Sequence, residues 1–318
     1  MTVTRAPRAL RDHLVDHAFG LAWTVGAHTP EPVTSRLLGG AAAVVLRRRG
    51  AGVRRLERNL ERATSGLSGA DRQALTDRAV RSYFRYWHEA FRLQSWTERR
   101  IVDSVVTTNE RPLREGFGQG GGAIVALPHM ANWDLAGAWA CLTGMPVTTV
   151  AERLRPESLY DRFVSYRESL GMEVVALTGA VHPVQAMRAA LQRGRLVCLL
   201  ADRDLSGSGV EVDLLGEAAR LPGGPAVLAR MTGAPLVAAT LSYAGPLLRI
   251  NFSDPVPVVR GKDGVRAMTQ TVADAFSTGI RRTPQDWHML QRVFVADLDP
   301  DWTEGSGPGT STGSGARG

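Results

Sequence analysis

"GGAIVALPHMANWDLAGAWACL", residues 121–142, is the stretch of sequence that decides the fold. A glycine-led apolar run ends at His129, and a helical pattern begins near Asn132, so the histidine lies in a strand-to-helix turn. Further apolar runs alternate with helical patterns as far as residue 282. This alternation predicts an α/β fold with a central, mostly parallel sheet flanked by helices.

The remaining elements follow from the same two patterns. Strands are expected over 121–129, 146–152, 172–177, 195–202, 235–243 and 247–253. Helices are expected over 8–27, 31–49, 51–64, from 69 onward, and over 134–142, 156–171, 182–194, 222–234 and 264–282. In the helix that begins at residue 69, apolar side chains recur on one face at a spacing typical of core packing: Val80, Phe84, Trp87 and Phe91.

Length and composition fit one large domain. A chain of 318 residues can bury a sizeable core, and we expect a single domain over 1–302. Its first part, 1–100, is helical and basic, and its second part, 101–302, is α/β. The remainder, 303–318, is rich in Gly, Ser and Thr and is expected to be disordered.

The cysteine usage and the lack of a recognisable secretory signal favour a cytosolic location. The only two cysteines, Cys141 and Cys198, lie in apolar runs and indicate neither a disulfide framework nor a metal-ligand spacing. The opening residues lack the apolar core of a secretory signal. The longest apolar run near the start, 37–46, is too short to span a bilayer. We therefore expect membrane contact that is at most peripheral.

Positive charge is concentrated near the N-terminus. Residues 1–100 contain 18 arginines and 9 acidic residues, whereas the rest of the chain contains 20 basic and 22 acidic residues. The densest run is "RRRGAGVRRLERNLER", 47–62, which suits an anionic membrane surface. An ordinary solvated helix face is the alternative, because Lys262 is the only lysine and arginine fills nearly every basic role. No nucleic-acid module accompanies the patch, so nucleic acid is not an expected partner.

The turn at His129 has the composition of an acid–base site. The N-terminus of the following helix favours neutral imidazole, and Asp134 is placed to accept the other ring N–H. No Gly-x-Ser-x-Gly elbow occurs, and no cysteine lies beside the motif, so the nucleophile would be a hydroxyl of the substrate. Taken alone, the spacing favours a hydrogen-bonded structural histidine over a catalytic one.

One long block and two short ones carry a family resemblance. "HMANWD", 129–134, resembles the His-x4-Asp/Glu motif of glycerolipid and lipid A acyltransferases. The block 202–237 contains Gly-Val-Glu-Val, Leu-Leu-Gly, Pro-Gly-Gly-Pro-Ala and Thr-Gly-Ala-Pro steps in the family's order, with Leu-Leu where the family typically has two phenylalanines. "RRLERNLERA", 54–63, resembles the basic, Asn-Leu-containing segment near the start of these proteins.

Two further blocks, 82–93 and 151–171, are similar to the actinobacterial phosphatidylinositol mannoside acyltransferases. The resemblance implies transfer of a fatty acyl group from acyl-CoA, as donor substrate, to a mannose hydroxyl of the glycolipid. It also implies a peripheral position on the cytoplasmic face of the plasma membrane, with 1–100 facing the membrane and 101–302 catalytic, and no metal or other cofactor.

The resemblance also implies residue roles. His129 would be the base, Asp134 its partner and Asp202 a further member of the relay, although Asp204 is close to Asp202. Glu152 and Arg167 would line the sugar-binding groove, and Asn132 and Trp133 would shape the turn and wall the site. Arg203 and Arg220 are candidates for the phosphates of the donor; the alternative for Arg203 is a solvated loop residue paired with its acidic neighbours.

Two other functions stay open on the sequence. The first is an acyltransferase of the same superfamily with another glycolipid or a lysophospholipid as acceptor. The second is a non-catalytic membrane-binding protein that retains the fold. An intact His129 and Asp134 argue against the second.

Overall fold

The computed structural model describes residues 29–152, 156–177, 183–204 and 207–298, together with Gly20 and Trp23. Apart from those two residues, the predicted helix 8–27 lies outside the described residues, and so does the predicted disordered tail 303–318.

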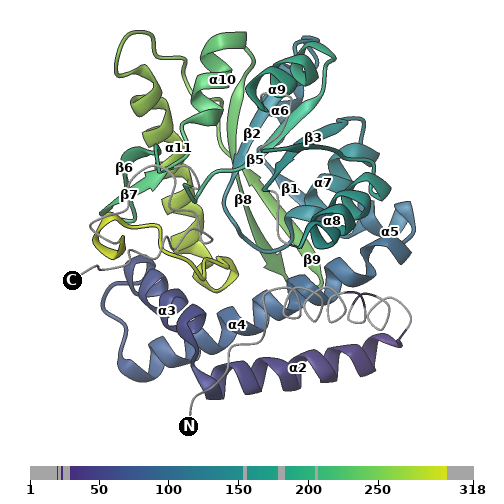
Figure 1. Ribbon diagram of the computed structural model, residues 1–318, viewed down its shortest axis with the longest axis vertical. Coiled ribbons are helices and arrows are strands. Elements are labelled where there is room, and N and C mark those ends of the chain that lie inside the picture. Colours follow the sequence, from purple (N-terminus) through teal and green to yellow (C-terminus); the bar gives the residue numbers. More distant parts are fainter. Residues whose placement is uncertain are drawn as a thin grey trace, which may run out of the picture.

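A seven-stranded sheet forms the centre of the molecule (Figure 1). Its strands are β1 (Val105–Thr108), β2 (Ala123–Leu127), β3 (Val147–Ala151), β4 (Glu173–Ala176), β5 (Leu196–Leu200), β8 (Leu236–Ala244) and β9 (Leu247–Phe252). The spatial order is β1-β9-β8-β2-β5-β3-β4. Strands β8, β2, β5, β3 and β4 run parallel to one another. Strand β9 pairs antiparallel with β8, and β1 pairs parallel with β9, so these two strands at one edge run in the opposite direction. The predicted mostly parallel sheet is confirmed.

The pairing of β2 with β5 positions the functional residues. Leu127 and Leu200, the last residues of the two strands, are partners in the register. All five residues of β2 are buried, as expected for a central strand covered on both faces. The residues that follow β2 and β5 therefore emerge side by side at the carboxyl edge of the sheet, where ligands of α/β proteins collect.

Helices cover both faces of the sheet. They are α2 (Glu31–Arg48), α3 (Ala51–Ala63), α4 (Gly69–Arg92), α5 (Glu98–Asp103), α6 (Arg111–Phe117), α7 (Trp133–Leu142), α8 (Glu157–Ser169), α9 (Pro183–Gln192), α10 (Gly224–Thr232) and α11 (Gly264–Arg282), with 3-10 turns η1 (Leu93–Ser95), η2 (Pro284–Asp286) and η3 (Val295–Asp297). Helices α10 and α11 lie on one side of the sheet and α7 on the other (Figure 1). This gives the layered arrangement that the alternating pattern predicts.

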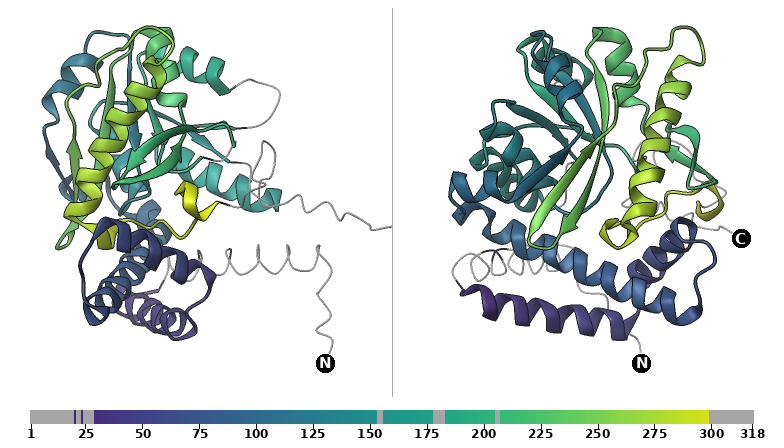
Figure 2. Two further views of the ribbon diagram at one scale, coloured as in Figure 1. Left: turned by 90° about the vertical axis from the view of Figure 1, so that its left-hand side faces the viewer. Right: turned by 180° about the vertical axis from the view of Figure 1, so that it is seen from behind.

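The basic N-terminal helices form a layer beneath the sheet. All views show α2, α3 and α4 at the same end of the molecule (Figures 1 and 2). They share a small apolar core of their own: Ala42, Val53, Leu56, Leu60, Leu75, Ala79 and Val80. Helix α4 also contributes Tyr86, Ala90 and Phe91 to the main core and packs on η2. The layer is thus fixed across the carboxyl edge of the parallel strands, close to His129.

Some elements differ from the sequence-based expectation. The edge strand β1 has only four residues, none of them buried, so its apolar run is too short to stand out. The hairpin of β6 (Val210–Leu214) and β7 (Glu217–Leu221) falls in a block that resemblance, and not periodicity, singles out. The short helices α5 and α6 are also absent from the expected elements. None of the helices in the described part of the chain combines the length and the apolar character needed to cross a bilayer.

Candidate active site

His129 and Asp202 form a hydrogen-bonded pair at the carboxyl edge of the sheet. His129 Nδ1 lies 2.6 Å from Asp202 Oδ1, and the His129 main-chain N–H donates to Asp202 Oδ2 at 2.9 Å. Asp202 is fully buried, whereas the His129 side chain keeps 27% of its surface exposed. A carboxylate can only accept here, so the ring proton sits on Nδ1 and leaves Nε2 free to take a proton.

The partner expected for His129 was Asp134, and that expectation is wrong. Asp134 is the second residue of α7, and its side chain turns inward, with 1% exposure. Its Oδ1 accepts from Arg167 Nε at 2.9 Å, and its Oδ2 accepts from the Tyr86 hydroxyl at 3.0 Å. The ring N–H of His129 is directed to Asp202 instead, because β5 neighbours β2 in the sheet.

Asp202 rather than Asp204 contacts the histidine. Asp204 accepts from the main chain of Gly209 at 2.7 Å and so stabilises the loop after β5. Burial of Asp202 opposes ionisation, but the charge of His129 and hydrogen bonds from His129 and Trp287 more than offset it. The pKa of Asp202 is therefore held below its ordinary value. Asp202 is an anion beside the histidine at neutral pH.

The Asp134–Arg167–Tyr86 cluster lies just below the groove. The side chain of Arg167 is 15% exposed. Burial would lower the pKa of its guanidinium, but the negative charge of Asp134 raises it, so the ion pair stays charged. Burial, together with Asp134, raises the pKa of Tyr86 well above its ordinary value and keeps it a hydroxyl donor. The cluster ties α7 to α8 and α4.

Asn132 and Trp133 shape the turn. The Asn132 side chain caps α7 by accepting from Leu135 N at 2.9 Å, and its amide donates to Glu89 Oε2 at 2.9 Å. Trp133 stacks on Tyr86 with ring centroids 4.2 Å apart and forms a T-shaped pair with His129, with centroids 5.4 Å apart. The main chain of Ala131 is left-handed, with φ +44°, which sets the sharp turn between strand and helix.

His129 opens into a groove of about 570 Å³ at the carboxyl edge. The groove is lined mainly by apolar and aromatic side chains, Tyr83, Trp87 and Trp133 among them, and a few charged ones, including Glu152, Arg167 and Arg203. Burial lowers the pKa of Arg203, although the charges of Glu152 and Asp202 oppose that shift. The two predicted groove residues, Glu152 and Arg167, and the candidate for the donor phosphates, Arg203, therefore line one groove with His129.

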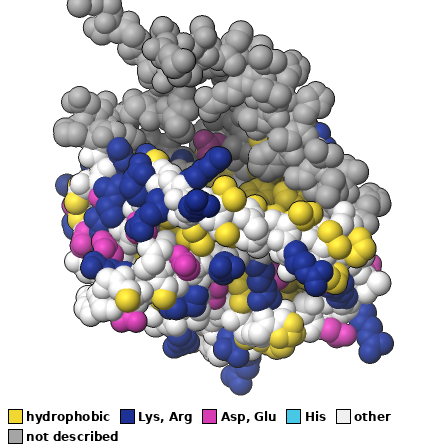
Figure 3. All heavy atoms as spheres, turned by 90° about the horizontal axis from the view of Figure 1, so that it is seen from below, with side chains coloured by type: hydrophobic (Ala, Val, Ile, Leu, Met, Phe, Trp, Pro, Cys, Tyr) yellow, Lys and Arg dark blue, Asp and Glu magenta, His cyan; other side chains and the backbone are white. Residues whose placement is uncertain are grey.

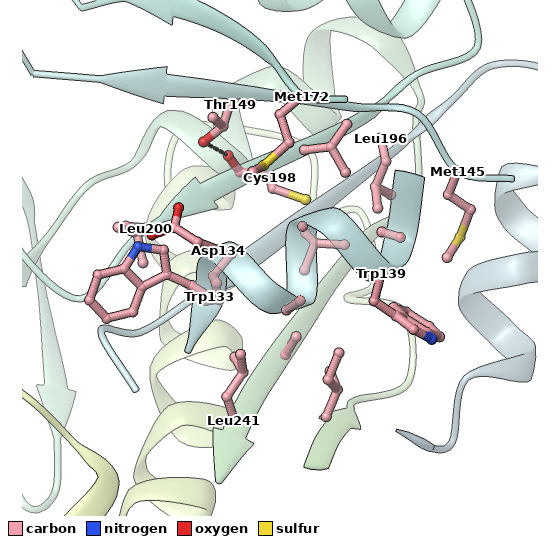
Figure 4. Close-up of a pocket in the computed structure, with 18 of the residues that line it drawn as sticks. Trp133, Asp134, Trp139, Met145, Thr149, Met172, Leu196, Cys198, Leu200 and Leu241 are labelled. Carbon is pink, nitrogen blue, oxygen red and sulfur yellow. Dashed lines mark hydrogen bonds between the residues drawn. The ribbon is translucent and has the colours of Figure 1, made fainter. Parts of the chain in front are cut away.

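A narrow apolar cavity of about 70 Å³ adjoins the groove. It runs between α7 and the sheet, from Trp133 and Asp134 at one end toward Trp139 and Met145 at the other (Figure 4). Alternate residues along β2 and β5 line the cavity, because every second side chain of a strand points to the same face of the sheet. Four residues line both the cavity and the groove: Trp133, Val150, Arg167 and Leu200. The two spaces therefore meet beside the histidine.

Sequence reasoning missed the residues that support the motif from α4 and η2. Ser82, Tyr86 and Glu89 recur along α4 at helical spacing and bind Asp286, Asp134 and Asn132 respectively. That polar stripe lies beside the apolar stripe of the same helix, and its spacing is the signal that could have revealed it. Trp287 and Asp286 lie in no pattern that points to the site.

Comparison with known proteins decides the family. The model of the bacterial lipid A biosynthesis acyltransferases matches residues 5–295. The chain belongs to this family.

Curated relatives of this acyltransferase cover nearly its whole length. The phosphatidylinositol mannoside acyltransferase of Mycolicibacterium smegmatis is 39% identical over 293 residues, which is 92% of this chain and 95% of the relative. The phosphatidylinositol mannoside acyltransferase of Mycobacterium tuberculosis is 39% identical over 287 residues, 89% of each chain. The resemblance noted from the short blocks therefore extends over the whole described fold.

Proposed function

We propose that this acyltransferase moves a fatty acyl group from acyl-CoA to a mannose hydroxyl of a phosphatidylinositol mannoside, with His129 as general base. The observation that carries the mechanism is the His129–Asp202 pair, which leaves Nε2 of a partly exposed histidine facing the groove. The relatives that carry this name support the acceptor.

The reaction needs one proton shuttle. His129 Nε2 takes the proton of the sugar hydroxyl while the oxygen attacks the thioester carbonyl carbon. The resulting imidazolium is stabilised by the ionised Asp202 at Nδ1. The carbon–sulfur bond then breaks, and the thiolate of coenzyme A receives the proton from Nε2. The products are the acylated sugar and free thiol, and the histidine returns to its starting form.

The apolar lining of the cavity suits an acyl chain, and a long chain would require the cavity to widen beyond its volume of about 70 Å³. It has few polar atoms on its walls, it ends beside His129, and it lies within the fold where water is excluded. A chain inserted along α7 would place its thioester where the cavity meets the groove. Arg203, in the same groove, is the candidate to pair with a phosphate of the donor.

The groove suits a polar acceptor. Glu152 can accept hydrogen bonds from sugar hydroxyls, and Arg167 lines the same space. Aromatic faces such as Trp87 and Trp133 offer apolar surfaces on which sugar rings stack. These features support a glycolipid over a small free alcohol, since they extend the contact well beyond one hydroxyl.

The N-terminal helices are proposed to bring the site to an anionic membrane, on the cytoplasmic face of the plasma membrane. Helix α2 carries exposed apolar side chains, Val33, Leu37 and Val44 among them, near exposed arginines. Seen from below, dark blue and yellow side chains share this face (Figure 3). Basic side chains that attract anionic lipid, mixed with apolar ones, are typical of peripheral membrane proteins.

A thiol-release assay with purified protein tests the chemistry. Palmitoyl-CoA is offered with phosphatidylinositol mannoside, with unmannosylated phosphatidylinositol and with a lysophospholipid. Release only with the mannosylated lipid supports the proposal. Preference for the lysophospholipid would show that the enzyme uses another acceptor. No thiol release with any lipid hydroxyl would indicate a non-catalytic binding protein.

Vesicle binding tests the membrane contact. Neutralising Arg47, Arg48, Arg49, Arg54 and Arg55 should abolish salt-sensitive binding to anionic vesicles, because each basic residue near such a surface contributes about 1 kcal/mol. The matched control neutralises five exposed arginines of the α/β part: Arg249, Arg260, Arg266, Arg281 and Arg282. Equal binding by both variants would contradict the membrane orientation.

A further inference from the structure

The segment that follows α11 crosses the catalytic turn like an added strand. The main-chain N–H of Ala131 donates to Asp286 O at 2.8 Å, and that of His288 donates to His129 O at 2.8 Å. Between these two bonds, Met130 and Trp287 form an antiparallel bridge. The turn that carries His129 is therefore paired on its outer side by residues more than 150 positions later in the chain.

Trp287 reaches the catalytic acid itself. Its ring is fully buried, and the indole N–H donates to Asp202 Oδ2 at 2.9 Å. The same oxygen accepts the main-chain N–H of His129, while Oδ1 faces the ring nitrogen. Asp202 thus has donors on both oxygens, and of these three donors only the Trp287 indole does not come from His129.

This arrangement sets both the direction and the charge of Asp202. A carboxylate in an apolar environment rotates or takes up a proton unless donors hold it. The indole N–H fixes Oδ2 and leaves Oδ1 aligned with His129 Nδ1. It also shares the negative charge, and hydrogen bonds to charged groups are stronger than those between neutral ones.

The segment is in turn held by the N-terminal layer. Asn59 of α3, which is 1% exposed, donates to Met289 O at 2.8 Å and to Gln291 O at 2.9 Å. Ser82 of α4 donates to Asp286 Oδ1 at 2.8 Å. Asn59 is the asparagine of the "RNLER" block, so this block fixes the main chain just after Trp287.

We propose that Trp287 is a positioning residue for acyl transfer, which holds Asp202 ionised and aligned on His129, and that Asn59 fixes the segment that carries it. The inference rests on the proposed function, because it assumes that His129 is the base. It adds two residues that lie outside the blocks 129–134 and 202–237. Trp287 acts through Asp202 and touches no substrate.

Trp287→Phe removes the indole N–H and keeps an aromatic ring in the core. We expect kcat to fall about tenfold while KM changes little, since about one charge-assisted hydrogen bond is lost. The acidic limb of the pH profile of kcat/KM should move to higher pH, because the carboxylate without its donor holds the imidazolium proton more tightly. A residue that only fills the core would lower thermal stability and leave this limb in place.

Trp96→Phe is the matched control. The Trp96 indole nitrogen is buried and makes no hydrogen bond within the described residues. This variant should keep the wild-type kcat and pH profile. If wild type transfers acyl groups and Trp287→Phe has the same kcat and limb as Trp96→Phe, the positioning role is overturned. If wild type transfers nothing, the proposed function itself fails.

A nuclear magnetic resonance measurement keeps the inference testable without substrate. In wild type, the Trp287 indole N–H should lie downfield of an unbonded indole and move upfield in Asp202→Asn, while the Trp96 signal stays in place. An unmoved Trp287 signal would overturn the contact. In Asn59→Ala, the downfield shift of the Trp287 indole signal should be smaller, and kcat should fall by a few fold. A wild-type kcat in that variant would show that Asn59 does not support the position of Trp287.

Discussion

Two acid-containing clusters lie at the same turn, and they differ in whether a polar atom remains available to a substrate. The His129–Asp202 pair exposes one ring nitrogen to the groove. The Asp134–Arg167–Tyr86 cluster occupies both oxygens of its carboxylate within the protein. The first arrangement can exchange a proton with a substrate, whereas the second joins three helices. Under the proposed mechanism, the short motif 129–134 therefore contains one residue of the proton relay and one anchor.

The difference comes from how each acid reaches the turn. Asp202 follows β5, which pairs with β2, so the sheet itself brings the acid to the histidine. Asp134 is in the first turn of α7 and points inward, toward α8 and α4. Nearness in the sequence is thus a poorer guide to partnership than nearness in the sheet.

Removal of the His129 side chain should have the largest effect on acyl transfer. His129→Ala should lower acyl transfer about 10³-fold or more, because a positioned general base contributes about 10²–10⁴-fold. Thiol release at saturating substrate measures the loss. The control is His88→Gln, on α4, since His88 binds Thr34 and does not line the groove. Full activity in His129→Ala would remove the proposed mechanism.

A double-mutant cycle sharpens the description of the second cluster as an anchor. Asp134→Leu leaves the Arg167 guanidinium largely buried without its carboxylate, and we expect a loss of about 3–5 kcal/mol in the free energy of unfolding. Asp134→Leu combined with Arg167→Met should recover most of that loss, because no buried charge remains. Chemical denaturation of the two single variants and the double variant measures the coupling. Additive losses would contradict the ion pair.

A second histidine at the groove, His288, extends the contrast. His288 is buried, its Nε2 lies 2.9 Å from Ser82 Oγ, and burial lowers its pKa to about 3. Because the unfolded chain binds this proton near pH 6.5, His288 contributes full stability above that pH. The contribution is lost as the pH falls toward 3, by about 1.4 kcal/mol per pH unit.

His288→Gln should remove this slope. Denaturation of wild type and variant between about pH 7 and pH 4 measures it, and the gap in stability between them should narrow as the pH falls. A gap that stays constant would mean that His288 is not held neutral. Either result leaves the assignment of the base unchanged, since the His129 side chain is 27% exposed in the groove, whereas His288 is buried.

The smallest effect concerns the apolar cavity that is proposed to receive the acyl chain. Leu196→Phe fills the end far from Asp134 and should shift preference toward shorter acyl-CoA chains by several fold, while overpacking costs about 1–3 kcal/mol of stability. Leu200→Phe lies where cavity and groove meet and should slow all chain lengths alike. Transfer rates measured with acyl-CoA of different chain lengths test this prediction. If both variants show the same dependence of rate on chain length, the acyl chain does not occupy this cavity.

Much of the fold could be predicted from local pattern. The apolar run into His129 and the helical pattern after Asn132 correspond to β2 and α7, and all six predicted strands are present. Sheet order is a different matter, because hydrophobic periodicity carries no information about which strands pair. The partnership of His129 with Asp202, 73 residues apart, depends on that order.

The remaining support of the site is still more distant in sequence. Trp287 lies 85 residues from Asp202, and Asn59 lies 230 residues from Met289. Neither contact repeats along the chain, so no spacing rule can detect it. The polar stripe of α4 was detectable in principle, but the apolar stripe beside it dominates the pattern.

The pH dependence of kcat/KM in Asp202→Asn and Asp134→Asn tests the central claim most directly. The account predicts that Asp202→Asn lowers kcat by about 10³-fold and moves the acidic limb to lower pH, because the imidazolium loses its anion. Asp134→Asn should lower thermal stability and leave the limb at its wild-type pH. A limb that moves in Asp134→Asn and stays in place in Asp202→Asn would contradict the assignment of the catalytic pair.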